Sequence, residues 1–102
     1  MNHQKILKSL KTDQFIKIVN TGNWFESGSV IYAKEIKQNI FLLFVIFKDA
    51  QEEKIRALIA HFDSFSSIGA KEPKQIMFYL SIREKEDLHY FEKYLNVTEN
   101  KV

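Results

Sequence analysis

An uninterrupted apolar run over residues 40–47 constrains the fold of this chain more than any other segment. Its eight residues fall far short of the ~20 that a membrane-spanning helix needs, so the run predicts no membrane span. Isoleucine, leucine, phenylalanine and valine follow one another without the polar alternation of a half-exposed strand. We therefore predict a strand over residues 40–48 whose two faces are both covered by the rest of the chain.

The length of 102 residues predicts one domain and leaves little room for a second. Hydrophobic residues make up 45% of the chain and nine residues are phenylalanine, which is enough for a packed core. We assign residues 1–96 to a single domain and residues 97–102 to a polar C-terminal tail.

The absence of cysteine excludes disulfide bonds, thiolate metal sites and a cysteine nucleophile. Residues 1–10 alternate charged and apolar side chains and lack the continuous apolar region of a signal peptide. We therefore expect a cytoplasmic protein. Thirteen lysines against two arginines are typical of an AT-rich genome and indicate a low-GC bacterium or its phage.

The first half of the chain predicts a short helix followed by three strands. Apolar residues share one side of a helix over residues 3–10. A glycine-containing loop joins strands over residues 15–20 and 30–37, and a tight turn separates the second of these from the strand at 40–48. Because short turns join neighbouring strands in antiparallel fashion, we expect a three-stranded meander.

The second half predicts a helix, a strand and a final helix. Asp49 with Glu52 three residues later resembles a capping box at the start of a helix over residues 50–65. A strand over residues 75–82, apolar on both faces, and a helix opened by Glu84 then follow. The apolar side chains at helical spacing in the central segment are Ile55, Leu58, Ile59, Phe62 and Phe65.

These elements predict an α+β fold in the order αβββαβα. The helical crossover makes the fourth strand parallel to the first and third, so the sheet is four-stranded and mixed, and packed with helices. The predicted core consists of Phe15, Val19, Ile31, Leu42, Phe44, Ile46, Ile55, Leu58, Ile59, Phe62, Phe78, Leu80, Leu88, Phe91 and Leu95.

This topology brings aromatic and acidic residues to one end of the sheet. Adjacent large aromatic residues in a long hairpin loop are typical of an interface anchor, or alternatively cap the end of the core. The acids attract a basic partner, bind a divalent cation, or only complement the dipoles of the helices they open. The predicted partner-binding residues are Trp24, Phe25, Glu26, Asp49, Glu52, Glu53, Glu84, Glu86 and Asp87.

Lysines collect at the opposite end of the predicted sheet, where they offer contacts to nucleic-acid phosphates. They are scattered and lack interleaved exposed aromatics, and the net charge of the chain is only +2. A nucleic-acid interface is therefore the alternative to a protein interface. Its predicted residues are Lys11, Lys34, Lys37, Lys71 and Lys74.

The residues that catalysis and metal binding require are not grouped in any pattern we can identify. His3, His61 and His89 stand far apart and form no ligand spacing. The three glycines are isolated, so no glycine-rich phosphate loop is present. We expect no catalytic residues, no metal and no cofactor.

The pair Glu35 and Lys37 has the Glu-x-Lys spacing that metal-dependent nucleases use, and the predicted element order resembles the core of the PD-(D/E)xK nuclease family. That family also needs a metal-binding Asp, but no Asp lies between Gln14 and Lys48. The resemblance therefore implies at most a nuclease-like fold without its catalytic carboxylates. The order also resembles the double-stranded-RNA-binding αβββα unit, whose lysine cluster is replaced here by acids at residues 49–53.

We interpret the chain as a small non-catalytic interaction protein, an inhibitor or adaptor of bacterial or phage origin. It binds a protein partner or itself through the aromatic and acidic end of the sheet. Strands 40–48 and 75–82 are apolar on both faces, and three short helices cover only part of that apolar surface. We therefore expect a homodimer or a partner to bury the remainder.

Overall fold

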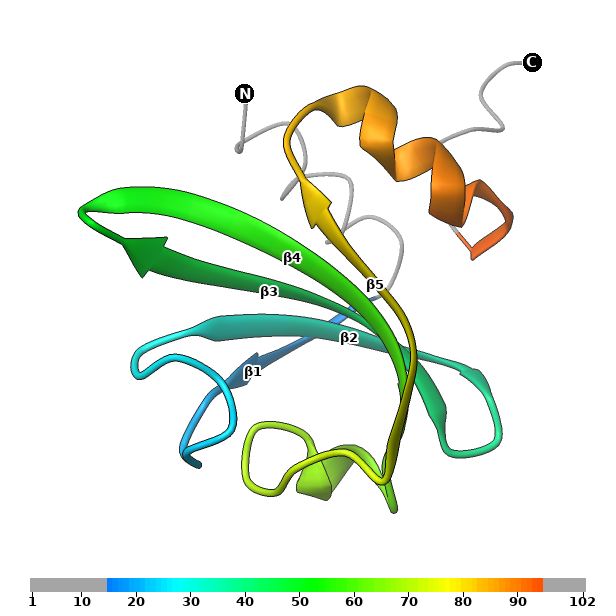
Figure 1. Ribbon diagram of the computed structural model, residues 1–102. Coiled ribbons are helices and arrows are strands. Elements are labelled where there is room, and N and C mark those ends of the chain that lie inside the picture. The colour runs from blue at the N-terminus through cyan, green and yellow to red at the C-terminus, as the bar shows by residue number, and fades with distance from the viewer. Residues whose placement is uncertain (1–14, 95–102) are drawn as a thin grey trace.

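The computed structural model describes residues 15–94 and shows one antiparallel sheet of five strands with two 3₁₀ helices (Figure 1). The strands follow one another in space in their order along the chain, as a continuous meander. Their bounds are β1 Ile16–Val19, β2 Val30–Lys37, β3 Ile40–Asp49, β4 Glu52–His61 and β5 Gln75–Ile82, with η1 at Phe65–Ser67 and η2 at Lys85–Tyr94.

The predicted helix over residues 50–65 is wrong, because this segment forms β4. Ala50 and Gln51 both have positive φ, 53° and 69°, which makes a tight two-residue hairpin turn between β3 and β4. Asp49 and Glu52 therefore face each other across a strand pair instead of capping a helix. Neither turn residue is the Asn or Gly that normally announces this turn.

The α+β fold with a mixed sheet is also wrong, because every strand pair is antiparallel. β4 lies between β3 and β5, and the last predicted helix is the 3₁₀ helix η2, so residues 15–94 contain no α-helix. β1, β3 and β5 still run in the same direction. β4 carries the chain from the end of β3 back to the end of the sheet where β5 starts, as the predicted helix would have done. The predicted helix over residues 3–10 and the tail over residues 97–102 lie outside the described residues.

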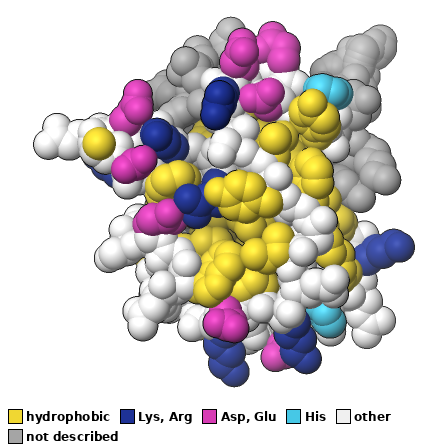
Figure 2. Space-filling view, in the orientation of Figure 1, with side chains coloured by type: hydrophobic (Ala, Val, Ile, Leu, Met, Phe, Trp, Pro, Cys, Tyr) yellow, Lys and Arg dark blue, Asp and Glu magenta, His cyan; other side chains and the backbone are white. Residues whose placement is uncertain are grey.

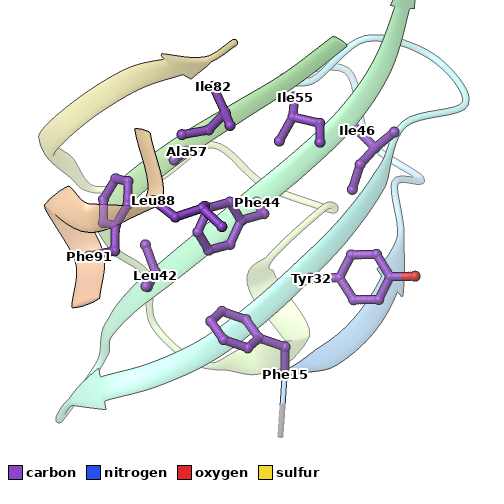
Figure 3. Packing of buried hydrophobic residues seen from close by; sticks show 10 residues of the cluster. All are labelled: Phe15, Tyr32, Leu42, Phe44, Ile46, Ile55, Ala57, Ile82, Leu88 and Phe91. Carbon is purple, nitrogen blue, oxygen red and sulfur yellow. The ribbon is translucent and has the colours of Figure 1, made fainter. Parts of the chain in front are cut away.

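The core has two layers, one on each face of the sheet, and β3 contributes to both. Leu42, Phe44 and Ile46 lie in the layer under η2, which Figure 3 shows; we call this side the η2 face. Phe41 and Leu43 lie in the layer on the other side, under the β1–β2 loop and the β4–β5 connection; we call it the loop face. The prediction that residues 40–48 form a strand covered on both faces is confirmed.

Most of the predicted core residues are buried, and the two that are exposed lie on the outermost strands. Val19 on β1 is 62% exposed and Phe78 on β5 is 39% exposed, so both predictions are wrong. Ile59 and Leu80 are only partly buried against the η2-face layer. Leu95 lies outside the described residues. The buried members of the prediction are Phe15, Ile31, Leu42, Phe44, Ile46, Ile55, Leu58, Phe62, Leu88 and Phe91.

Candidate functional site

The predicted aromatic and acidic residues lie on segments that meet at one end of the sheet. β1, β3 and β5 all end there, so the β1–β2 loop, the β3–β4 hairpin and the start of η2 share this end (Figure 1). The β3–β4 hairpin extends beyond its neighbours, because β2 begins opposite Ile46 and β5 ends opposite Ile55. We call this part of the molecule the acidic end.

Within the β1–β2 loop the two aromatic residues have different roles. Phe25 is 3% exposed and belongs to the loop-face core, so it caps the core. Trp24 is 40% exposed and meets the Phe25 ring edge-on, with 4.6 Å between the ring centroids. Only Trp24 therefore stays available as an anchor for a partner.

A dense set of hydrogen bonds holds this loop against the β4–β5 connection. The Asn20 side-chain amide donates to the carbonyl oxygens of Phe25 and Glu26, at 3.2 and 3.1 Å. The backbone N–H groups of Thr21 and Gly22 both donate to the carbonyl oxygen of Gly69, at 2.8 and 2.6 Å. The two segments thus form one covering layer on the loop face.

Glu26 makes a bidentate ion pair with Arg56 of β4, at 3.0 and 2.8 Å. The Arg56 guanidinium also lies 4.2 Å from the centroid of the Phe47 ring and 5.6 Å from that of Tyr79. The hydrogen bonds from Arg56 lower the pKa of Glu26, whereas burial alone would raise it. Burial works to lower the pKa of Arg56, but the pairing with Glu26 outweighs it and the pKa is raised. The pair connects the loop to the sheet and to β5.

Arg56 is absent from the predicted site residues, although it is the one charged residue within the apolar part of β4. A cation between Ile55 and Ala57 signals a partner, because a charge in an apolar run is retained when it is paired. Its partner Glu26 lies thirty residues away, at a position that only the tertiary fold brings near.

Several acids at the acidic end have local partners. Asp49 pairs with Lys54 across the hairpin at 3.2 Å. Asp87 accepts hydrogen bonds from the backbone N–H groups of Arg83 and Glu84, at 2.7 and 3.0 Å, and these bonds lower its pKa. Among residues 15–94, no group of three or more His, Asp or Glu side chains is close enough to hold a metal ion. The exposed acids that remain for an encounter with a partner include Glu52, Glu84 and Glu86.

The described lysines of the predicted lysine-rich end lie on separate segments. Lys74 makes an ion pair with Asp63 at 2.8 Å, and the hydrogen bond from Lys74 lowers the pKa of Asp63. The Lys34 ammonium lies 5.6 Å from the centroid of the Phe15 ring, on β2 itself. Lys37 ends β2 and Lys71 follows η1. Lys11 lies outside the described residues.

The Glu-x-Lys pair lies at the end of β2, beside the turn to β3. The Glu35 carboxylate accepts a hydrogen bond from the backbone N–H of Asn39 at 2.8 Å. The register of β2 against β3 shifts between Glu35 and Lys37, which removes the regular alternation that would hold both on one face. The five-stranded meander also differs from both element orders that the sequence resembled.

The described histidines stay apart. His61 ends β4 opposite Ile40, whereas His89 lies on η2, where its ring nitrogen is 2.9 Å from the carbonyl oxygen of Glu86. His3 lies outside the described residues.

The longest run of exposed apolar side chains in the described residues lies on β5, the last strand of the sheet. Its predicted bounds, residues 75–82, are confirmed. Met77 is 48% exposed and Tyr79 is 52% exposed, with Ile76 and Phe78 at 39% each. Figure 2 shows hydrophobic side chains gathered in the middle of the view, with basic and acidic side chains among them. We call residues 76–79 the β5 strip.

The strip contains a β-bulge. Ile59 faces Phe78 and Ala60 faces Ile76, which leaves Met77 without an opposite residue on β4. On the η2 face, the Phe78 ring lies 5.6 Å from the Phe91 ring of η2. The half of β5 that follows the bulge, residues 78–82, keeps regular antiparallel register with β4.

In the part of the chain that the structure describes, no helix is long and apolar enough to cross a membrane. No family model, no curated protein and no solved structure shows significant similarity to the chain.

Proposed function

We propose that this protein is a non-catalytic interaction domain that binds a polypeptide along β5. The observation that carries the proposal is the β5 strip, four consecutive exposed side chains on an edge strand. Within residues 15–94 the outer side of this strand pairs with no other strand. The backbone groups along such an edge are a template for an added strand, and the exposed side chains supply apolar contacts.

The acidic end supports the same function by steering the partner. Trp24 is exposed at that end, and Glu84 and Glu86 follow the last residue of β5. A negative potential beside an apolar strip speeds the approach of a partner with a basic flank, and it orients that partner along the strand. In this proposal the β5 strip provides the affinity, and the acids set the orientation of the partner along the strand.

The causes of the pKa shifts among the described titratable groups also agree with a binding function. The described residues with a shifted pKa are Glu26, Arg56, Asp63 and Asp87, and each shift follows from an ion pair or a helix cap. Catalytic groups typically have pKa values shifted by burial within a shared cleft. We therefore favour recognition over catalysis.

Site-specific photo-cross-linking in the native host tests the proposal. A benzophenone side chain in place of Tyr79 is expected to capture one extended segment of a polypeptide, mapped by mass spectrometry. The same group in place of Val19, which is 62% exposed on β1, is the matched control and is expected to capture nothing reproducible. Equal capture at both positions, or none at Tyr79, contradicts the proposal.

A further inference from the structure

We infer that the polypeptide that adds to β5 is a second copy of this chain. The two β5 strands pair antiparallel about a twofold axis, and the two sheets join into one. This inference rests on the proposed function, because it names the partner of the same strand edge.

The composition of β5 is the first argument for a second copy. Gln75–Ile82 contains no Lys, Arg, Asp or Glu, whereas each of the other four strands carries at least one. In a twofold antiparallel pair, a charged residue near the axis would lie close to its own copy, and like charges across a strand pair are destabilising. An uncharged strand avoids this repulsion.

The charges that flank β5 are the second argument, because they differ in sign. Lys71 and Lys74 precede the strand with one acid between them, and three acids against two bases follow it at residues 83–87. Antiparallel pairing places the basic flank of one copy beside the acidic flank of the other. A parallel arrangement would place like flanks together, so the charge distribution selects the antiparallel one.

The bulge limits where the strands pair. Met77 interrupts the register, and bulges are a common means of blunting a strand edge. The pairing edge is therefore the regular half, residues 78–82. Antiparallel pairing there continues both faces, with Phe78 and Leu80 of each copy on the η2 face and Tyr79 on the loop face.

The expected affinity follows from the small area. A strand of this length with the β5 strip falls short of the ~800 Å² per partner of a standard interface. We therefore expect a dimer with a Kd on the order of 10 µM, in the range of weak and transient interfaces.

Sedimentation velocity over a concentration series from about 1 to about 500 µM brackets this Kd. The wild type is expected to shift from monomer to dimer. Tyr79→Lys places a charge beside its own copy and is expected to raise Kd at least tenfold. Val19→Lys, on the opposite edge, is the matched control and is expected to leave Kd unchanged. Thermal melts of all three proteins verify that each one is folded.

Isotope-filtered NOE spectra of a mixed labelled and unlabelled wild-type sample keep the test independent of the variants. Contacts between residues 78–82 of the two copies are expected. A monomer throughout the series, a dimer that Tyr79→Lys does not weaken, or intermolecular contacts elsewhere would each overturn the inference. If the chain is monomeric while the Tyr79 probe captures another polypeptide, only the second copy is excluded. If that probe also captures nothing, the proposed function fails as well.

Discussion

The two edges of the sheet expose apolar side chains to similar extents but differ in length and charge. On β1, Ile16 and Val19 are 49% and 62% exposed, but the strand has only four residues and contains Lys17. β5 has eight residues and no charge. Short length and lysine are two ways in which proteins prevent a strand edge from pairing with another chain. Exposure alone therefore does not identify an interface, whereas a long uncharged edge indicates one.

The largest expected effect on stability comes from truncating the η2 side chain that covers the core next to β5. Phe91 is fully buried on η2, with its ring 5.6 Å from the rings of Phe44 and Phe78. Phe91→Ala is expected to lower the free energy of unfolding by about 3–5 kcal/mol in urea titrations, because it leaves a cavity. Tyr90→Ala, at the exposed neighbouring position, is the control. Similar effects of both variants would mean that η2 does not hold β5 in place.

The second effect concerns Arg56, which connects β5 with the loop that follows β1. Arg56→Ala breaks the bidentate pair with Glu26 and the contact with the Tyr79 ring. We expect a loss of about 1–2 kcal/mol in thermal or urea unfolding, reduced by the partial exposure of Glu26. The control Lys54→Ala removes an ion pair whose side chains are both exposed, and is expected to change little. Equal losses would contradict a special role for Arg56.

The same pair predicts a pH dependence. The pKa of Glu26 lies below its ordinary value of 4.5 because Arg56 donates hydrogen bonds to it. Its contribution to stability is therefore complete above about pH 4.5 and is lost as the pH falls through the lower, folded-state pKa. Urea titrations are expected to show the advantage of wild type over Glu26→Gln shrinking over the pH window that opens below about pH 4.5. A constant difference across that window would exclude the pair as its source.

The smallest expected effect is a change in amide hydrogen exchange, which distinguishes the β5 edge from the β1 edge directly. If only β5 pairs with a second copy, amide hydrogen exchange within residues 78–82 slows as the protein concentration rises. Exchange within β1 stays the same, because the short charged edge gains no partner. The expected change is only a few-fold, because a weak dimer protects these amides in proportion to its population. Concentration-dependent protection on β1 would reverse the comparison.

The sequence predicts the strands well where turn residues delimit them. Gly28 and Ser29 precede β2, Asn39 follows it, and Pro73 precedes β5, and the predicted bounds of both strands match the structure. β4 escapes prediction because it is apolar on both faces. Ile55 and Ala57 point to the η2 face and Leu58 to the loop face, so the same residues fit both a helical and a strand period.

The candidate site is also only partly predictable, because tertiary contacts decide which of its residues are buried. The loop sequence singles out Trp24 and Phe25, but which ring is buried depends on Asn20 and on the distant Gly69, which hold the loop in place. Strand 75–82 is predicted as apolar on both faces. The position of this strand at the edge of the sheet is not predicted, because it depends on β4 being a strand. One misassigned segment thus changes which element lies between β3 and β5.

The short, lysine-bearing β1 has a consequence for how far assembly proceeds. A sheet with two open edges adds copies without limit and grows into a fibre, as head-to-tail contacts do when they fail to close. Within residues 15–94 β5 is the one long, uncharged edge, and a twofold contact between β5 strands uses it in both copies at once. Growth then ends at two chains, and β1 acts as the terminator on either side. Lengthening β1 or replacing Lys17 with an apolar residue would remove that stop and convert a finite pair into a polymer.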